Sequence, residues 1–134
     1  MSAFCGMLDF KHKQFTYSNY GHPTQYFYRV TDATIIFLGS QTSLLGLAFE
    51  DEKIYEHQID FQKGNKLFLF TDGVIETKGY GNEEYGRNRL EDFIRRKHGL
   101  KAEDFNNKLL DELNAFKNEK FRDDIFMLTV DIKK

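Results

Sequence analysis

The chain has 134 residues and a mass of 15.8 kDa, which suits a single domain that buries roughly two-thirds of its unfolded surface. Its 19 basic and 21 acidic residues leave a formal charge of -2, so the composition gives no electrostatic reason to expect binding to nucleic acid or to a membrane surface. No apolar run approaches the roughly 20 residues of a membrane span, and no basic segment followed by an apolar run opens the chain, so we expect a cytoplasmic protein without membrane insertion.

Aromatic residues and a single cysteine set further bounds. The 14 Phe and 7 Tyr residues must fill much of the core, and both types favour strands. Cys5 is the only cysteine, so no intrachain disulfide can form, and a reducing compartment is the simpler expectation. We expect Cys5 to be a small buried side chain rather than a nucleophile.

The N-terminal segment is expected to form four strands. An apolar run over residues 3–10 and alternating aromatic residues over 14–19 predict a hairpin. After a turn at 21–23, residues 26–30 and 34–38 predict two more strands. A four-stranded antiparallel meander is the simplest arrangement of these segments.

The middle of the chain predicts a loop and then a buried strand. Residues 39–52 contain glycines around two leucines and are typical of an ordered loop, whose acidic run at 50–52 is most simply solvated. Residues 57–61 are a candidate for a short strand. The continuous apolar run over 66–71 predicts a strand that is buried on both faces.

The remaining segments predict two helices and a last strand. Apolar residues recur at helical spacing at Leu90, Phe93 and Ile94, and again at Ala102, Phe105, Leu109, Leu113 and Phe116. Residues 125–132 predict the final strand. This order favours an α+β fold with largely antiparallel sheets and two helices packed on one sheet face. No linker or repeat interrupts the chain, so residues 1–134 are expected to form a single domain.

Two acidic turns carry the strongest indication of chemistry. Asp72 follows the strand over 66–71, and Asp123 and Asp124 precede the last strand. If these strands pair antiparallel, the carboxylates meet at one edge of the sheet, where they could bind a hard metal cation. Two alternatives stay open: each turn by itself is more often a plain turn, and Arg122 could neutralise the carboxylates in a structural ion pair.

Other catalytic patterns are absent from the sequence. It has no phosphate-binding P-loop, no dinucleotide fingerprint and no nucleophile elbow, and its histidines stand too far apart for a local zinc site. His22 lies in the turn over residues 19–23, which could present its imidazole to a cleft. A lone histidine is nevertheless more often a turn or surface residue.

Six segments occur in an order that is typical of one enzyme family. They are residues 8–9, 15–23, 45–47, 67–76, 85–86 and 122–125. Together they resemble the stage II sporulation protein E type of bacterial phosphatase, the bacterial regulatory branch of the protein phosphatase 2C superfamily. The resemblance runs from about Ala3 to the C-terminus, and its ordered spacing is far more specific than any single motif.

The resemblance implies a fold, an activity and a metal site. The fold is an α-β-β-α sandwich, and the activity is metal-dependent removal of phosphate from phosphoserine or phosphothreonine in regulatory proteins. Asp72 corresponds to the metal-binding Asp of the family's Thr-Asp-Gly motif, and Asp123 to the first Asp of its terminal Asp-Asp motif. The implied metals are Mn2+ or Mg2+ in a two-metal centre, and no catalytic residue beyond the metal ligands is implied.

Four further residues are implied to support this site. Asp124 neighbours a metal ligand, and Gly73 lets the backbone turn away after the other. Asn19 and His22 belong to a turn that is a hallmark of the family, with no role assigned to it.

The resemblance also implies that the chain is one part of a domain. The family domain has an N-terminal half whose Gly-Asp motifs supply a bridging aspartate and a backbone carbonyl, and nothing in this sequence matches them. We therefore expect the C-terminal part of a phosphatase domain, inactive by itself, whose parent protein acts on a phosphorylated regulatory protein of the anti-sigma-factor antagonist type. The alternative is a non-catalytic interaction module derived from the phosphatase fold, which covers its open strand edges and apolar faces by binding a partner protein or by forming a homodimer.

Overall fold

The structure of the chain is a computed structural model that describes residues 2–40 and 56–134. The motif at residues 45–47 and the acidic run at 50–52 lie outside the described residues, as does most of the loop expected over 39–52. Within the described part of the chain, no helix is long and apolar enough to cross a membrane.

The described residues form seven strands, two α-helices and one short 3-10 helix. In chain order they are β1 (Ala3–Asp9), β2 (Gln14–Tyr20), β3 (Gln25–Arg29), β4 (Thr34–Leu38), β5 (His57–Asp60), β6 (Lys66–Phe70), η1 (Tyr80–Asn82), α1 (Gly86–Lys97), α2 (Ala102–Phe116) and β7 (Met127–Asp131). Each strand and helix expected for these parts of the chain is present, with ends that differ by a few residues.

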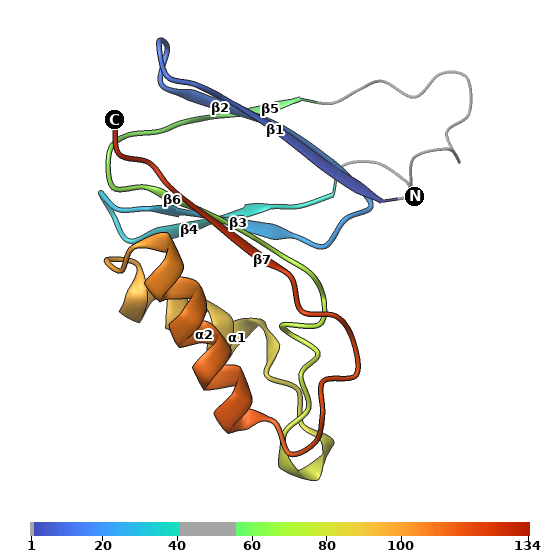
Figure 1. Cartoon of the computed structure of the whole chain (residues 1–134). Coiled ribbons are helices and arrows are strands. Elements are labelled where there is room, and N and C mark those ends of the chain that lie inside the picture. Colours follow the sequence, from blue (N-terminus) through green and yellow to red (C-terminus); the bar gives the residue numbers. More distant parts are fainter. Residues whose placement is uncertain (1, 41–55) are drawn as a thin grey trace, which may run out of the picture.

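The strands form two antiparallel sheets that face each other, and the helices lie against one of them (Figure 1). One sheet has the order β1-β2-β5, and the other has the order β4-β3-β6-β7. Both α1 and α2 cover the outer face of the four-stranded sheet, so the described residues form three layers. The expected α+β fold with antiparallel sheets and two helices on one sheet face is confirmed.

The first four strands do not form the expected meander, because the chain changes sheets between β2 and β3. β1 pairs with β2 in one sheet, and β3 pairs with β4 in the other. Each hairpin has an apolar face, and placing the hairpins face to face buries both. The rings of Phe15 and Phe27 stack across the two sheets with their centroids 6.0 Å apart. A single meander would leave these rings on an open face in contact with water.

Two apolar cores result, one on each face of the four-stranded sheet. The core between the sheets contains Phe15, Tyr17, Phe27, Leu38, Phe61, Leu67 and Ile132. The core under the helices includes Phe68, Phe70, Leu90, Phe93, Phe105 and Leu109. β6 contributes Leu67 to the first core and Phe68 and Phe70 to the second, which confirms that this strand is buried on both faces.

Cys5 is exposed, so the expectation that it is buried was wrong. Along β1, Phe4 and Leu8 pack toward the core between the sheets. Because strand side chains alternate, Cys5 and Met7 lie on the opposite face. No described helix covers this face of the three-stranded sheet (Figure 1), and Met7 is 62% exposed.

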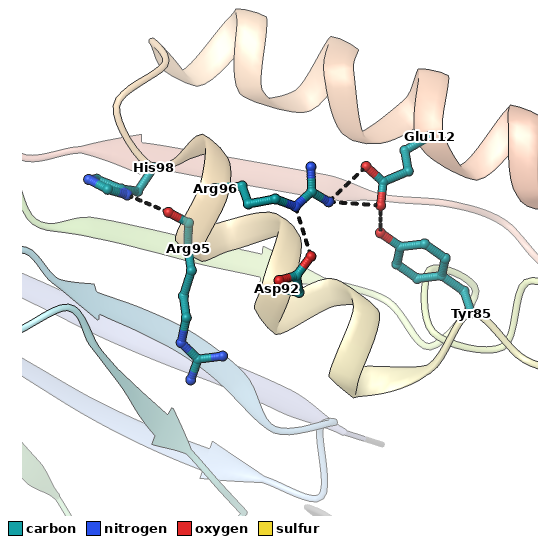
Figure 2. A network of polar contacts seen from close by, with 6 residues as sticks. All are labelled: Tyr85, Asp92, Arg95, Arg96, His98 and Glu112. Carbon is teal, nitrogen blue, oxygen red and sulfur yellow. Dashed lines mark hydrogen bonds and ion pairs between the residues drawn. The ribbon is translucent and has the colours of Figure 1, made fainter.

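A buried tyrosine joins the two helices. Tyr85, which directly precedes α1, donates a hydrogen bond from its hydroxyl to Oε1 of Glu112 on α2 at 2.6 Å. Arg96 on α1 pairs with the same carboxylate at 3.2 Å and with Asp92 at 2.7 Å (Figure 2). Burial and then the Glu112 carboxylate raise the pKa of the Tyr85 hydroxyl above its ordinary value of 10.0. The folded state therefore keeps this hydroxyl protonated.

We expect Tyr85→Phe to lower the free energy of unfolding by about 2 kcal/mol at neutral pH, because it removes a hydrogen bond to a charged acceptor but keeps the buried ring. The stability of the unsubstituted chain should also fall as the pH rises above about 10, since the unfolded state then releases a proton that the folded state keeps. Tyr85→Phe should reduce this alkaline loss. Urea unfolding at neutral pH and at about pH 10.5 measures both effects.

Tyr80→Phe is the matched control, because Tyr80 is exposed on η1 and its substitution should change neither quantity. An alkaline loss of the same size in Tyr85→Phe and in the unsubstituted chain would contradict the role given to Tyr85.

Candidate metal centre

The ends of β6 and β7 place the two acidic turns side by side. These strands pair antiparallel along their whole length. One residue beyond β6, the Thr71 N–H donates a hydrogen bond to the Phe126 carbonyl at 3.1 Å. Asp72 therefore lies next to the turn of Asp123 and Asp124, which is the arrangement that antiparallel pairing predicts.

The hydroxyl of Thr71 holds the second turn in place. Its Oγ1 donates a hydrogen bond to the Asp124 carbonyl at 3.0 Å and accepts one from the Phe126 N–H at 3.0 Å. Both partners are backbone groups of the segment that follows Asp123, so the hydroxyl positions this turn against the end of β6. This role of Thr71 was not predicted from the sequence. The signal that could have indicated it is the position of Thr71 at a strand end, directly before Asp72.

Gly73 lies where the two turns approach most closely. A Cβ atom at this position would lie 2.6 Å from the Asp124 carbonyl oxygen and 3.5 Å from the Asp123 carbonyl oxygen. These are backbone atoms, which cannot rotate away as the end of a flexible side chain can. The absence of a side chain at Gly73 thus permits Asp72 and Asp123 to share one edge of the sheet.

We expect Gly73→Ala to push the two turns apart and to destabilise the chain by about 1 to 3 kcal/mol, because the added methyl group overlaps a backbone oxygen. Gly99→Ala is the matched control, since a Cβ atom there would have no heavy atom within 4 Å. Thermal unfolding of both variants measures the difference. Equal midpoints for the two variants would contradict the close approach.

Buried Asn19 organises the turn that leads from β2 to β3. Its Oδ1 accepts a hydrogen bond from the His22 N–H at 2.9 Å, and its Nδ2 donates one to the Leu38 carbonyl at 3.0 Å. These contacts tie the turn to the end of β4 and bring His22 to the edge of the sheet that carries Asp72. The turn over residues 19–23, to which no role was assigned from the sequence, therefore has a structural role.

Gln25 connects this turn to the end of β6, and sequence reasoning missed it. Its Oε1 accepts a hydrogen bond from the Phe70 N–H at 2.6 Å, and its Nε2 donates one to the Pro23 carbonyl at 2.6 Å. The pairing of β3 with β6 ends at Tyr26 and Phe68, so the backbone of β3 does not pair with Phe70. The fully buried Gln25 side chain accepts the hydrogen bond of the Phe70 N–H instead. A polar residue at the start of an aromatic strand was the signal available in the sequence.

These elements surround one open pocket. It is lined by Ser2, His22, Pro23, Thr71, Asp72, Gly73, Asp123 and Asp124. Three acidic residues and one histidine, which come from three segments of the chain, therefore line the pocket. Asn19 does not line the pocket; it holds the turn that carries His22.

The donor chemistry of this pocket fits a hard divalent cation, because manganese and magnesium prefer carboxylate oxygens. The donors are fewer than a complete site needs. Among residues 2–40 and 56–134, no group of three or more His, Cys, Asp and Glu side chains is placed so that it could hold a metal ion. The residues present could thus supply one side of a metal centre, with the carboxylates of Asp72 and Asp123 coming from the turns at the ends of β6 and β7.

Arg122 does not neutralise the acidic turns. Its guanidinium lies 3.8 Å from the Glu119 carboxylate, and it forms no other ion pair within the described residues. The structural ion pair that the sequence left open as an alternative is therefore not formed. No cation in the described part of the chain pairs with Asp72 or Asp123.

Comparison with known proteins defines the class to which this chain belongs. The family model described as Stage II sporulation protein E (SpoIIE) matches residues 1–133. The chain therefore belongs to the SpoIIE family. The comparison with curated proteins found no match.

Solved structures of phosphatase domains have a similar fold. The SiaA-PP2C domain of Pseudomonas aeruginosa matches 98% of this chain with a TM-score of 0.83 and 18% identity, and the match covers 52% of that chain. The RsbU and RsbW domains of Rv1364c from Mycobacterium tuberculosis match 98% of this chain with a TM-score of 0.79 and 20% identity, over 37% of that chain. The manganese-presoaked phosphatase domain of the cell fate determinant SpoIIE from Bacillus subtilis matches 98% with a TM-score of 0.72 and 11% identity, over 56% of that chain.

These matches establish that the chain shares its fold with PP2C phosphatase domains. The chain spans about half the length of the SiaA and SpoIIE domains, with 52% and 56% of them covered.

Proposed function

We propose that this chain is the C-terminal part of a metal-dependent phosphoserine/phosphothreonine protein phosphatase, and that Asp72 and Asp123 are ligands of its metal centre. The observation that supports the proposal most directly is the pocket that both residues line at the ends of β6 and β7. Membership of the SpoIIE family and the fold shared with PP2C domains favour the same activity.

Manganese or magnesium is the metal that we propose. When bound, either ion would lower the pKa of a water molecule and neutralise charge on the phosphoryl oxygens. Asp72 and Asp123 would hold the metal, Gly73 would keep the two turns in close approach, and Asp124 would support the neighbouring carboxylate. The presoaking of the Bacillus subtilis SpoIIE domain with manganese agrees with this choice.

The remaining ligands would come from the rest of the domain, because this chain spans about half of the domains that it matches. We infer that the full-length protein is the enzyme and that this chain by itself is inactive. The proposed substrate is a phosphorylated regulatory protein of the anti-sigma-factor antagonist type. The Mycobacterium tuberculosis protein that matches the fold carries an RsbU domain and an RsbW domain, which agrees with a regulatory substrate.

Phosphate release tests this proposal. The full-length protein should hydrolyse p-nitrophenyl phosphate and a phosphoserine peptide when manganese or magnesium is present, and EDTA should abolish the reaction. This chain alone should release no phosphate under the same conditions. Hydrolysis that chelation leaves unchanged would contradict the metal dependence.

One feature of the surface favours a second function. The outer face of the three-stranded sheet, which carries Cys5 and Met7, is not covered by any described helix (Figure 1). A non-catalytic interaction module would cover this face by forming a homodimer. Calorimetric titration with manganese and light scattering separate the two functions. A dimer that takes up no metal would support the module, and a monomer that binds manganese would support the phosphatase.

A further inference from the structure

A hollow next to the acidic turns gathers positive charge. The cations that line it are Lys78, Lys117, Lys120 and Arg122. The carboxylates in the lining are Glu76 and Asp123, so cations outnumber them by four to two. The hollow also reaches Gly73, so it adjoins the candidate metal centre. Because the whole chain has a formal charge of -2, this excess of cations, which we call the basic hollow, is a local feature.

Backbone contacts hold the basic hollow next to the acidic turns. α2 ends at Phe116, and the chain then runs through residues 117–122 directly into Asp123. The Asn118 N–H donates a hydrogen bond to the Lys78 carbonyl at 3.2 Å, which joins this segment to the loop that follows β6. The two loops lie side by side at the bottom of Figure 1. The cations of the hollow therefore come from the two loops that also carry the acidic turns.

Three of the four cations have no strong ion pair. The guanidinium of Arg122 lies 3.8 Å from Glu119, and the side chains are 62% and 65% exposed, so water screens this pair. The ammonium of Lys117 lies 4.0 Å from the centre of the Phe121 ring. Within the described residues, neither Lys117 nor Lys120 forms a salt bridge, whereas the fourth cation pairs with a glutamate at 2.7 Å. Positive charge in the hollow is thus available to a ligand.

We propose that the cations around the basic hollow bind acidic residues that flank the phosphorylated serine or threonine of the substrate. The inference rests on the proposed phosphatase function, because it requires the phosphate to lie at the edge that carries Asp72 and Asp123. An extended peptide advances roughly 3.3 Å per residue, so residues two or three positions from the phosphate lie about 7 to 10 Å from it. Asp or Glu at those positions would reach the adjoining cations, which favours acidic flanks and speeds encounter.

Peptide binding to this chain tests the inference without requiring turnover. A fluorescent phosphoserine peptide flanked by Asp and Glu should bind about tenfold more tightly at low salt than the same peptide flanked by Asn and Gln. The double substitution Lys117→Gln with Lys120→Gln should remove most of this preference and reduce its salt dependence. Lys101→Gln with Lys133→Gln is the matched control, because Lys101 lies at the other end of α2 and Lys133 follows the far end of β7. This control should keep the preference.

Three results would overturn the inference. The first is equal binding of the two peptides by the unsubstituted chain, and the second is a loss in the control variant as large as the loss in the Lys117 and Lys120 variant. The third is tighter binding of a single-stranded oligonucleotide than of the acidic peptide, which would assign the hollow to nucleic acid.

Kinetics of the full-length protein separate this inference from the proposed function. The Lys117 and Lys120 double substitution should lower kcat/KM for the acidic peptide about tenfold through KM and leave hydrolysis of p-nitrophenyl phosphate unchanged. If the full-length protein hydrolyses no phosphoester, the phosphatase function alone is overturned. The preference of this chain for acidic flanks is measured separately, by peptide binding.

Discussion

Asp72→Asn and Asp123→Asn should each lower the metal-dependent phosphatase activity of the full-length protein by about a hundredfold or more. Each substitution removes a negative charge that, in the proposed metal centre, would hold the cation at the ends of β6 and β7. A loss of about 3 kcal/mol of transition-state stabilisation corresponds to roughly a hundredfold in rate. Asparagine keeps the size of the side chain and one carbonyl oxygen, so both turns should retain their shape. Initial rates of phosphate release at saturating manganese measure the effect.

Asp111→Asn is the control for these variants, because Asp111 is an exposed residue of α2 and lies outside the lining of the pocket. Its rate should equal that of the unsubstituted protein. Thermal unfolding should show that all three variants are folded, and calorimetric titration should show weaker manganese binding for Asp72→Asn and Asp123→Asn alone. Unchanged rates in either of these two variants would remove that residue from the proposed metal centre.

Asp131→Ala should produce the largest loss of stability among the substitutions considered, because Asp131 neutralises a buried lysine. Lys66 lies in β6 with its side chain 3% exposed, and its ammonium pairs with the Asp131 carboxylate on the neighbouring strand β7. The same ammonium donates a hydrogen bond to the Leu100 carbonyl at 2.9 Å. Asp131 Oδ2 accepts a hydrogen bond from the N–H of Ala102, the first residue of α2, at 2.8 Å. One carboxylate thus joins β6, β7 and the beginning of α2.

Removal of this carboxylate would leave a buried ammonium with one backbone acceptor, at a cost of about 3 to 5 kcal/mol in the free energy of unfolding. Loss of the contact to the helix N-terminus should add about 1 kcal/mol. Lys66→Met should cost much less, because the thioether side chain fills the apolar site and Asp131, which is 21% exposed, keeps its bond to Ala102. Urea unfolding of this chain measures each value.

A double-mutant cycle provides the control for this prediction. When Asp131→Ala is introduced into a Lys66→Met chain, the further loss should be much smaller than in the unsubstituted chain, because no buried charge remains to be left unpaired. Additive effects of the two substitutions, or a larger loss for Lys66→Met than for Asp131→Ala, would contradict the assignment of Lys66 as a buried charge that depends on Asp131.

Local patterns were sufficient to predict the individual elements. The apolar spacing of Leu90, Phe93 and Ile94 predicted α1, and the continuous apolar run of β6 predicted a strand with both faces buried. These patterns depend on the periods of helix and strand, which are properties of neighbouring residues.

The arrangement of the strands was not predictable in the same way. A meander and two facing hairpins place the same residues in strands, and the choice between them depends on where Phe15 and Phe27 find apolar partners. Cys5 was expected to be buried because free cysteines usually are, and alternation along β1 defines two faces but does not say which of them another layer covers. Gln25 was missed because its partners, Phe70 and Pro23, become neighbours through strand pairing and chain reversal.

The sequence by itself determined the two acidic turns, the strands that carry them and the order of motifs that led to the family, because each of these is a pattern of residues close together along the chain. Tertiary structure alone decided what surrounds Asp72 and Asp123. The backbone approach at Gly73, the position of His22 in the pocket and the basic hollow each depend on contacts between segments far apart in sequence. Such contacts form when sheets and helices pack to bury their apolar faces, and no local pattern specifies which distant segment will supply the neighbour.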